Sequence, residues 1–117
     1  MPDFKRAILI GNSKFNALPP LRCPAADVQA MDGVLRDEAI CWFSPVHTLV
    51  DAPHNEIFTR INEVLRDADK EDLVLIYYSG HGLLDARGRL FLAAQNTEPT
   101  LLHATAVSIA AIRDCLS

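Results

Sequence analysis

The sequence predicts an α/β domain in which a mainly parallel sheet lies between two layers of helices. Three apolar segments of strand length alternate with segments whose apolar residues recur at helical spacing. The third apolar segment, residues 73–78, contains no alternating polar residue, so we expect helices to cover both of its faces. Right-handed crossovers between parallel strands then give a three-layer α-β-α architecture.

The N-terminal part of the chain is predicted to form a strand, a loop and a helix. The strand covers residues 6–10, is expected at the centre of the sheet, and ends in a polar turn at 11–13. A loop over residues 14–22 follows, and Pro24 then suits the first position of a helix over 24–37. One face of this helix carries its apolar residues, Val28, Met31 and Leu35.

The middle of the chain repeats this order. A second strand is predicted at residues 46–50, and Asp51 is expected to cap the helix that follows. The apolar residues of that helix recur at helical spacing, at Ile57, Ile61, Val64 and Leu65. The solvated segment 70–72 then leads into the third strand.

The C-terminal third is predicted to contain a hairpin and a short helix. The hairpin covers residues 83–92 and turns at 85–88, beside the end of the third strand, where it can help to wall a substrate groove. Ser108 is a candidate cap for a last helix with Ile109, Ile112 and Leu116 on one face. Because no strand follows this helix, we expect a single domain over residues 1–117 that is incomplete at its C-terminus.

Composition argues against several classes of function. Half of the 117 residues are hydrophobic, 22% are charged and the formal net charge is -4, which is typical of a soluble globular domain. An acidic balance disfavours a nucleic-acid partner. The apolar runs are far shorter than the roughly 20 residues that span a bilayer, and no signal peptide precedes the first strand. We therefore expect a cytoplasmic protein that binds neither nucleic acid nor membrane.

The cysteines and histidines do not indicate a cofactor or metal site. Cys23, Cys41 and Cys115 are odd in number and widely spaced, so a disulfide framework is not expected. The four histidines lack the spacing of metal ligands. We expect reduced thiols, with Cys23 and Cys41 as small buried or half-buried residues.

The segment that follows the third strand carries the main candidate for chemistry. Ser79-Gly80-His81-Gly82 lies where a buried strand leaves its sheet, and α/β proteins place their ligands and reactive groups there. Without a Cβ at Gly80 and Gly82, the chain can turn sharply and another group can approach its backbone closely. An imidazole titrates near neutral pH, so the side chain of His81 suits proton transfer. An ordinary strand-to-loop turn remains compatible with the same residues.

Four segments occur in an order that is far more specific than the histidine motif alone. They are residues 6–12 (RAILIGN), 21–28 (LRCPAADV), 72–82 (DLVLIYYSGHG) and 88–94 (GRLFLAA). With them, essentially the whole chain resembles bacterial caspase-like cysteine peptidases, the relatives of metacaspases in peptidase family C14. The resemblance implies a caspase-type (caspase-hemoglobinase) fold, of which this chain is a p20-type domain truncated before the strand that carries the nucleophile.

The resemblance also implies roles for four residues in a cysteine-histidine dyad endopeptidase. His81 matches the catalytic histidine, and the backbone N–H of Gly82 matches the oxyanion-hole donor. Ser79 matches a residue lining the pocket for the side chain before the cleaved bond. Asp27 matches the acidic residue that holds a basic side chain there, which implies cleavage after Arg or Lys. Asp27 is equally explained as a negative charge in the first turn of a helix, so both interpretations remain open.

One required residue of the family is absent from this sequence. The nucleophile follows an Asp-x-Cys-x-Ser/Gly pattern on a fourth strand, about 50 residues after the histidine, and no such segment occurs here. Cys115 directly follows Asp114, lies too early after His81 and belongs to a helical pattern. We therefore expect this chain to be inactive alone. The third strand should also present an unpaired edge to which a partner strand or chain can add.

Two functions from different classes follow from these observations. The first is a cysteine endopeptidase acting on polypeptides, with its nucleophile supplied by downstream sequence. The alternative is a non-catalytic caspase-like interaction or regulatory module that completes its sheet with a partner's strand. A flavodoxin-like or receiver-type ligand domain is disfavoured, because Gly11-Asn12-Ser13 lacks the glycine spacing of a phosphate-binding loop.

Overall fold

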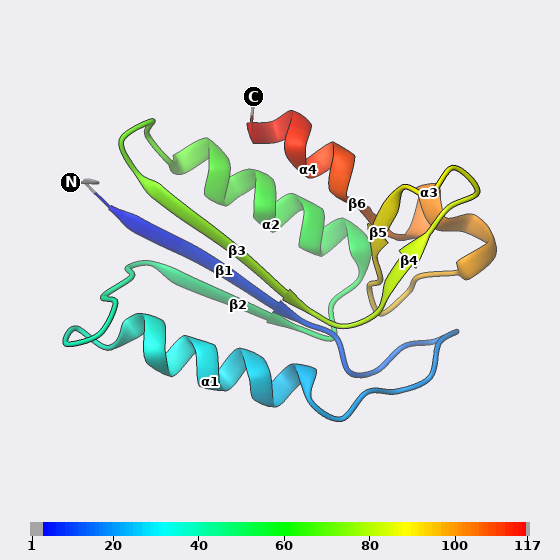
Figure 1. Ribbon diagram of the computed structural model, residues 1–117, viewed down its shortest axis with the longest axis horizontal. Helices are drawn as coiled ribbons and strands as arrows, with labels where there is room; N and C mark the ends of the chain where they lie inside the picture. Colours follow the sequence, from blue (N-terminus) through cyan, green and yellow to red (C-terminus); the bar gives the residue numbers. More distant parts are fainter. Residues whose placement is uncertain (1–3, 117) are drawn as a thin grey trace.

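The computed structural model describes residues 4–116, which form two small sheets and the helices packed around them (Figure 1). Its elements are, in chain order, β1 (Lys5–Gly11), α1 (Pro24–Arg36), β2 (Val46–Val50), α2 (His54–Asp67), β3 (Leu73–Ser79), β4 (Gly82–Leu84), β5 (Leu90–Leu92), the 3-10 helix η1 (Pro99–Leu101), α3 (Leu102–Thr105), β6 (Val107–Ser108) and α4 (Ile109–Leu116).

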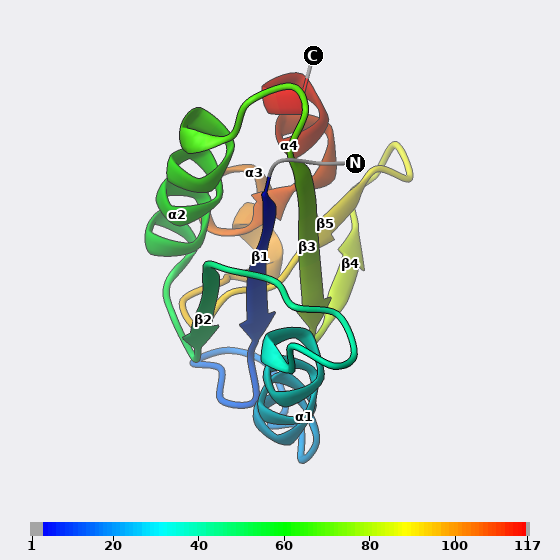
Figure 2. The same cartoon turned by 90° about the vertical axis from the view of Figure 1, so that its left-hand side faces the viewer.

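The main sheet is parallel and has the strand order β2-β1-β3, with β1 between the other two (Figure 2). Ile8 of β1 lies opposite His47 on one side and Ile76 on the other. Residues 7–10 of β1 have no exposed surface. The prediction of three parallel strands around a central first strand is therefore confirmed.

Helices cover both faces of this sheet, as Figure 1 shows. Because side chains alternate along a strand, Ile8 and Ile10 enter a core with α2 and α4, whereas Ala7 and Leu9 enter a core with α1. The same alternation sends Tyr78 toward the first core and Tyr77 toward the second. Burying each large aliphatic side chain contributes about 1.5–3 kcal/mol, so the two cores fix the helices to opposite faces.

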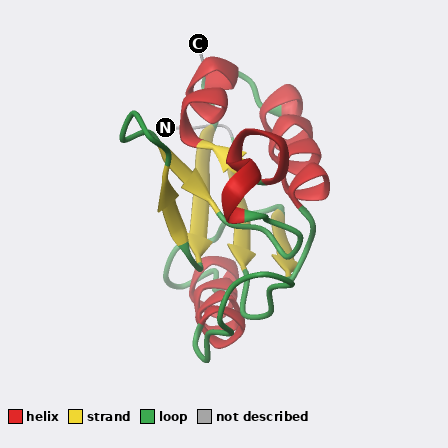
Figure 3. Cartoon of the chain, turned by 90° about the vertical axis from the view of Figure 1, so that its right-hand side faces the viewer, coloured by secondary structure: helices red, strands yellow, loops and turns green. Residues whose placement is uncertain are grey.

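A second, antiparallel sheet of order β4-β5-β6 lies beside the main sheet (Figure 3). The predicted hairpin is confirmed: Leu83 lies opposite Phe91, and Gly88 in the turn has a positive φ of 76°. Ser108 also acts as predicted, because its Oγ accepts the backbone N–H of Ala111 in the first turn of α4 at 3.2 Å. No sequence pattern predicted η1, α3 or β6.

Asp51 does not cap α2, and that prediction is wrong. Pro53 occupies the N-cap position, while Asp51 has a left-handed backbone with φ 55°. Its Oδ1 instead accepts the backbone N–H groups of Ser13 at 2.7 Å and Lys14 at 2.9 Å. The carboxylate therefore stabilises the turn after β1, because the N–H groups there have no strand to pair with.

Two smaller predictions also differ from the structure. Helix α1 ends at Arg36, one residue earlier than expected, with Asp37 in an extended conformation. Cys23 is exposed at the N-cap position of α1, so its expected burial is wrong, whereas Cys41 is half-buried as expected.

The outer edge of β3 is not paired with any strand among residues 4–116. Leu73 donates its N–H to Phe4 O at 2.9 Å, and Ser79 O accepts the N–H of Asn12 at 2.9 Å. In a strand the N–H and C=O of one residue point to the same side, and the side alternates from residue to residue. The N–H and C=O groups of Val74 and Ile76 therefore point away from β1. A row of unpaired N–H and C=O groups at a sheet edge can pair with another strand.

We expect the 117-residue chain to be oligomeric or poorly soluble by itself. Val74→Pro should restore a monomer, because it removes an outward-facing donor without removing a bond of the β1–β3 ladder. The control Leu75→Pro removes an inward-facing donor and should unfold the chain. Size-exclusion chromatography with light scattering measures both. A monodisperse monomer of the unaltered chain would contradict the prediction.

Candidate functional site

The residues predicted to form a site lie at the edge of the main sheet where its three parallel strands end. Asn12 and Ser13 follow β1, Asp51 follows β2, and His81 follows β3. Hydrogen bonds link these segments, from Asn12 N–H to Ser79 O and from Ser13 N–H to Asp51 Oδ1. Open α/β sheets commonly bind their ligands at this edge.

Asp27 and Ser79 are 52 positions apart in sequence and in contact in the structure. The Ser79 hydroxyl donates a hydrogen bond to Asp27 Oδ2 at 2.9 Å, and both residues are half-buried. Gly11 permits this contact, because a Cβ there would lie 2.6 Å from Val28 Cγ2 and 2.7 Å from Pro24 O. The first turn of α1 can therefore approach the end of β1 closely enough to bring Asp27 to the end of β3.

His81 is held by the loop between β1 and α1. Its Nε2 lies 2.8 Å from the Pro19 carbonyl oxygen, and its ring centroid is 4.9 Å from that of Phe15. A carbonyl only accepts hydrogen bonds, so Nε2 carries the hydrogen and Nδ1 of the neutral ring keeps the lone pair. The imidazole is thus fixed in one tautomer with Nδ1 as its base.

Sequence reasoning missed both residues that hold the histidine. Pro19 and Phe15 lie in the segment 14–22, for which the sequence predicted only a loop. A backbone carbonyl contributes to a site whatever its side chain, so no residue pattern could have identified Pro19 O. Phe15 is the one aromatic residue of the loop 14–22, and that was the available signal for it.

The two glycines around His81 have different surroundings. A Cβ at Gly80 would lie 2.4 Å from the Tyr78 hydroxyl oxygen, whereas one at Gly82 would lie 3.3 Å from Leu90 Cδ1. The expected close approach is therefore confirmed at Gly80. Neither residue uses the left-handed backbone that glycine favours; among residues 4–116, Gly88 is the only glycine with positive φ.

The backbone N–H of Gly82 is directed away from the β4–β5 ladder. Ala93 donates its N–H to His81 O at 2.9 Å, and Asp85 donates its N–H to Arg89 O at 3.0 Å. In an antiparallel pair, hydrogen-bonded and non-hydrogen-bonded positions alternate, so the intervening Gly82–Leu92 pair is non-hydrogen-bonded. Gly82 is exposed, and its N–H is therefore available to a ligand beside His81.

None of the three thiols hydrogen-bonds to His81. Cys115 lies in α4, as its helical pattern predicted, and its Sγ contacts Asn62 Oδ1 of α2 at 3.2 Å. Cys23 begins α1, and Cys41 packs against the core on the α1 side of the sheet. The chain thus contains a positioned histidine and no cysteine that pairs with it.

Comparison with known proteins places this geometry in a family. The caspase domain family, peptidase C14, matches residues 4–116, which include the whole candidate site. The chain belongs to the caspase domain family. The resemblance inferred from the sequence motifs is thereby confirmed, and the peptidase class follows at the level of the family.

Two curated relatives match part of the caspase domain. The human mucosa-associated lymphoid tissue lymphoma translocation protein 1 and its mouse homolog are each 35% identical over 78 residues. The match covers 67% of this chain and 9% of the length of each relative. The roles of His81, Gly82, Asp27 and Ser79 remain predictions.

Residues 4–116 contain no group of three or more His, Cys, Asp or Glu side chains that could hold a metal ion. No helix in this range has the length and apolar composition needed to cross a membrane.

A surface groove of about 350 Å³ lies between α2 and the α3–β6–α4 segment. Its lining includes His54 and His103 but no residue of the candidate site.

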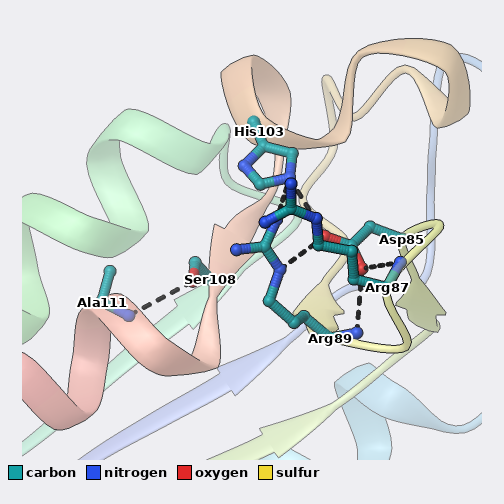
Figure 4. Close-up of polar contacts among 6 residues, drawn as sticks. All are labelled: Asp85, Arg87, Arg89, His103, Ser108 and Ala111. Atoms are coloured by element: carbon teal, nitrogen blue, oxygen red, sulfur yellow. Dashed lines mark hydrogen bonds and ion pairs between the residues drawn. The ribbon is translucent and has the colours of Figure 1, made fainter.

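The Asp85 carboxylate holds the hairpin that begins at Gly82 (Figure 4). Its Oδ1 accepts the N–H groups of Arg87 and Arg89, both at 2.9 Å. Its Oδ2 lies 2.8 Å from Arg89 Nε and 3.1 Å from His103 Nε2 of α3. The backbone N–H and the guanidinium of Arg89 hold the pKa of Asp85 well below its ordinary value, despite desolvation.

Acid is therefore expected to destabilise the chain. A carboxyl group whose pKa is lower in the folded state contributes stability that is complete above its unfolded pKa, about 4, and is lost as the pH falls through the folded pKa. Asp72 adds to this effect, because the N–H of Asp69 and the Arg6 side chain lower its pKa. Urea unfolding between about pH 6 and about pH 2 measures the loss.

Asp85→Asn should be less stable at about pH 6 and lose less stability in acid than the unaltered chain. Asp67→Asn is the matched control, because Asp67 pairs with the exposed Arg66 at the end of α2. An acid dependence that is the same in Asp85→Asn and the unaltered chain would contradict the assignment.

Proposed function

We propose that this chain is the histidine-bearing part of a metacaspase-like cysteine endopeptidase that cleaves polypeptides after arginine or lysine. The nucleophilic cysteine is supplied by sequence outside these 117 residues. The observation that carries the proposal is His81, held by Pro19 O with Nδ1 as its base, in a chain of the caspase domain family. Composition favours a cytoplasmic location.

In the proposed reaction, His81 Nδ1 takes the proton of the cysteine thiol, and the thiolate attacks the scissile carbonyl carbon. The Gly82 N–H binds the oxygen that becomes negative in the tetrahedral intermediate. The imidazolium then gives its proton to the departing amine, leaving an acyl-enzyme that water hydrolyses. Throughout, the Nε2–H bond to Pro19 O keeps the ring in one orientation.

The proposed specificity rests on Asp27. Ser79 uses Oδ2 of this carboxylate, at 2.9 Å, and the geometry suits a guanidinium or ammonium group of a substrate at the same carboxylate. Asp27 lies in the first turn of α1, where a negative charge also interacts favourably with the helix dipole. The two roles are compatible, because the dipole interaction does not occupy the carboxylate oxygens.

The nucleophile is expected on a fourth strand that adds to the outer edge of β3, completing a three-layer caspase-type sheet. The N–H and C=O groups of Val74 and Ile76 would then pair with that strand. This placement puts the cysteine and His81 at the same end of neighbouring parallel strands, where their side chains can meet.

The second candidate is a non-catalytic caspase-like module that binds a partner through the β3 edge. It is favoured by the outer edge of β3, which is unpaired among residues 4–116 and can accept a partner's strand. Reading the coding sequence beyond Ser117 separates the two candidates. An apolar strand followed by Asp-x-Cys-x-Ser/Gly supports the peptidase, and a stop codon supports the module.

In a longer form that includes this nucleophile, His81→Ala is expected to lower kcat by at least about 10²-fold, because general acid–base catalysis is lost. His54→Ala is the control, since His54 lies at the start of α2 and contacts Asn96. Cleavage of an arginine peptide measures both. Full activity of His81→Ala would reject the dyad.

Asp27→Asn is expected to lower kcat/KM for arginine and lysine substrates by about 10²-fold or more, because the neutral amide loses the charge of an ion pair in the pocket. Asp32→Asn is the matched control, since Asp32 lies in the same helix and pairs with Arg36. Peptides that differ only in the residue before the cleaved bond measure the ratio. Cleavage after aspartate but not arginine would contradict the assignment.

A further inference from the structure

Polar groups from two parts of the chain contact the carbonyl oxygen of His81, and a side chain from a third part binds the carbonyl of Ala93 beside it. Ala93 at the end of β5 donates its N–H to this oxygen at 2.9 Å. The Tyr78 hydroxyl lies 3.0 Å from the same oxygen and 2.7 Å from Ala93 O. Asn12, which follows β1 and has no exposed surface, donates its Nδ2 hydrogen to Ala93 O at 2.7 Å.

The Tyr78 hydroxyl is a donor in this network. Carbonyl oxygens only accept, and a phenol has a single hydrogen to give. Ala93 O already accepts from Asn12 Nδ2, and His81 O already accepts from the Ala93 N–H. Each oxygen keeps a second lone pair, so the Tyr78 hydrogen is shared between Ala93 O at 2.7 Å and His81 O at 3.0 Å. Burial raises the pKa of the Tyr78 phenol, despite the opposing effects of Asn12 and Ala93, so the hydrogen is retained at neutral pH.

The His81–Gly82 peptide group connects this network to the candidate site. A trans peptide is planar, with its C=O and N–H pointing in opposite directions. Donors that fix the His81 carbonyl therefore also fix the direction of the Gly82 N–H. They also polarise the peptide group and strengthen its N–H as a donor.

We propose that Tyr78 is a positioning residue, which aims the Gly82 N–H by binding the carbonyl on the other side of the same peptide group. The inference rests on the proposed function to the extent that the Gly82 N–H is an oxyanion donor. The clamp formed by Tyr78, Asn12 and Ala93 keeps this donor oriented before substrate binds. Preorganisation of this kind avoids reorienting the donor during the reaction.

The absence of a Cβ at Gly80 also supports a positioning role for Tyr78. The Tyr78 hydroxyl reaches the His81 carbonyl across Gly80, where a Cβ would lie 2.4 Å from the hydroxyl oxygen and 2.7 Å from Cζ. Any other residue at position 80 would displace the ring. The Tyr-Ser-Gly-His-Gly spacing thus gives the hydroxyl its path to the carbonyl.

The direct test compares Tyr78→Phe with the matched control Tyr77→Phe. Tyr77 packs on the α1 side of the sheet, so Tyr77→Phe removes a hydroxyl oxygen that lies away from the network. The residual dipolar coupling of the Gly82 N–H, which reports the direction of that bond, is measured by NMR in the Val74→Pro background to keep the chain monomeric. We expect it to change in Tyr78→Phe and to stay constant in Tyr77→Phe.

The second measurement is cleavage by the longer form that includes the nucleophile. Complete loss of an oxyanion donor costs about 10²–10³-fold in kcat, and Tyr78→Phe leaves the Ala93 N–H in place, so we expect a fall of about tenfold. KM should change by less than about twofold, because the Asp27 pocket is untouched. Tyr77→Phe should match the unaltered enzyme in both constants.

Each outcome bears on one proposal. An unchanged Gly82 coupling in Tyr78→Phe overturns the positioning role, whether or not the protein cleaves peptides. A changed coupling with unchanged kcat overturns its importance for catalysis. If the unaltered longer form cleaves no peptide, the proposed function fails, and the dipolar coupling still decides whether Tyr78 orients the Gly82 N–H.

Discussion

The central position of β1 is the constraint on which the rest of the structure depends. Its residues 7–10 are fully buried, and alternate side chains enter two different cores. Neither helical layer can shift without exposing one of these side chains, at a cost of about 1.5–3 kcal/mol for each large one. The point at which β1 leaves the sheet is therefore fixed. The segments of the candidate site lie around this point and contact it.

Two glycines transmit this constraint to the site through close contact. At Gly11 the missing Cβ lets the first turn of α1 approach the end of β1, which brings Asp27 to Ser79. At Gly80 the missing Cβ leaves room for the Tyr78 hydroxyl beside the His81 carbonyl. In both cases glycine serves packing rather than an unusual backbone conformation.

The functional groups of the site are mainly held by backbone atoms. The Pro19 carbonyl orients the His81 ring, and the Ala93 N–H orients the His81 carbonyl. The hairpin that follows is closed by Asp85, which binds two backbone N–H groups and reaches His103 of α3. Polar contacts thus connect the hairpin that follows His81 to α3.

The sequence by itself determined the order of the main elements and the family. Apolar periodicity reflects burial, and the burial of β1 and of one face of α1 and α2 follows from residue type and spacing. The apolar run of β3 is only half-buried, because the outer edge of this strand is unpaired among residues 4–116. The hairpin followed from local turn chemistry at residues 85–88. The motif around His81 made this histidine a candidate, because its glycines and its place after an apolar strand are local properties.

Only the tertiary structure decided which groups meet. Asp27 and Ser79 come together through the approach of α1 to Gly11, and Asp51 binds the turn after β1 instead of capping α2. The roles of Pro19 O, Ala93 N–H and Tyr78 depend on backbone groups that every residue possesses. A linear pattern records side chains and their spacing, whereas these contacts depend on the three-dimensional path of the chain.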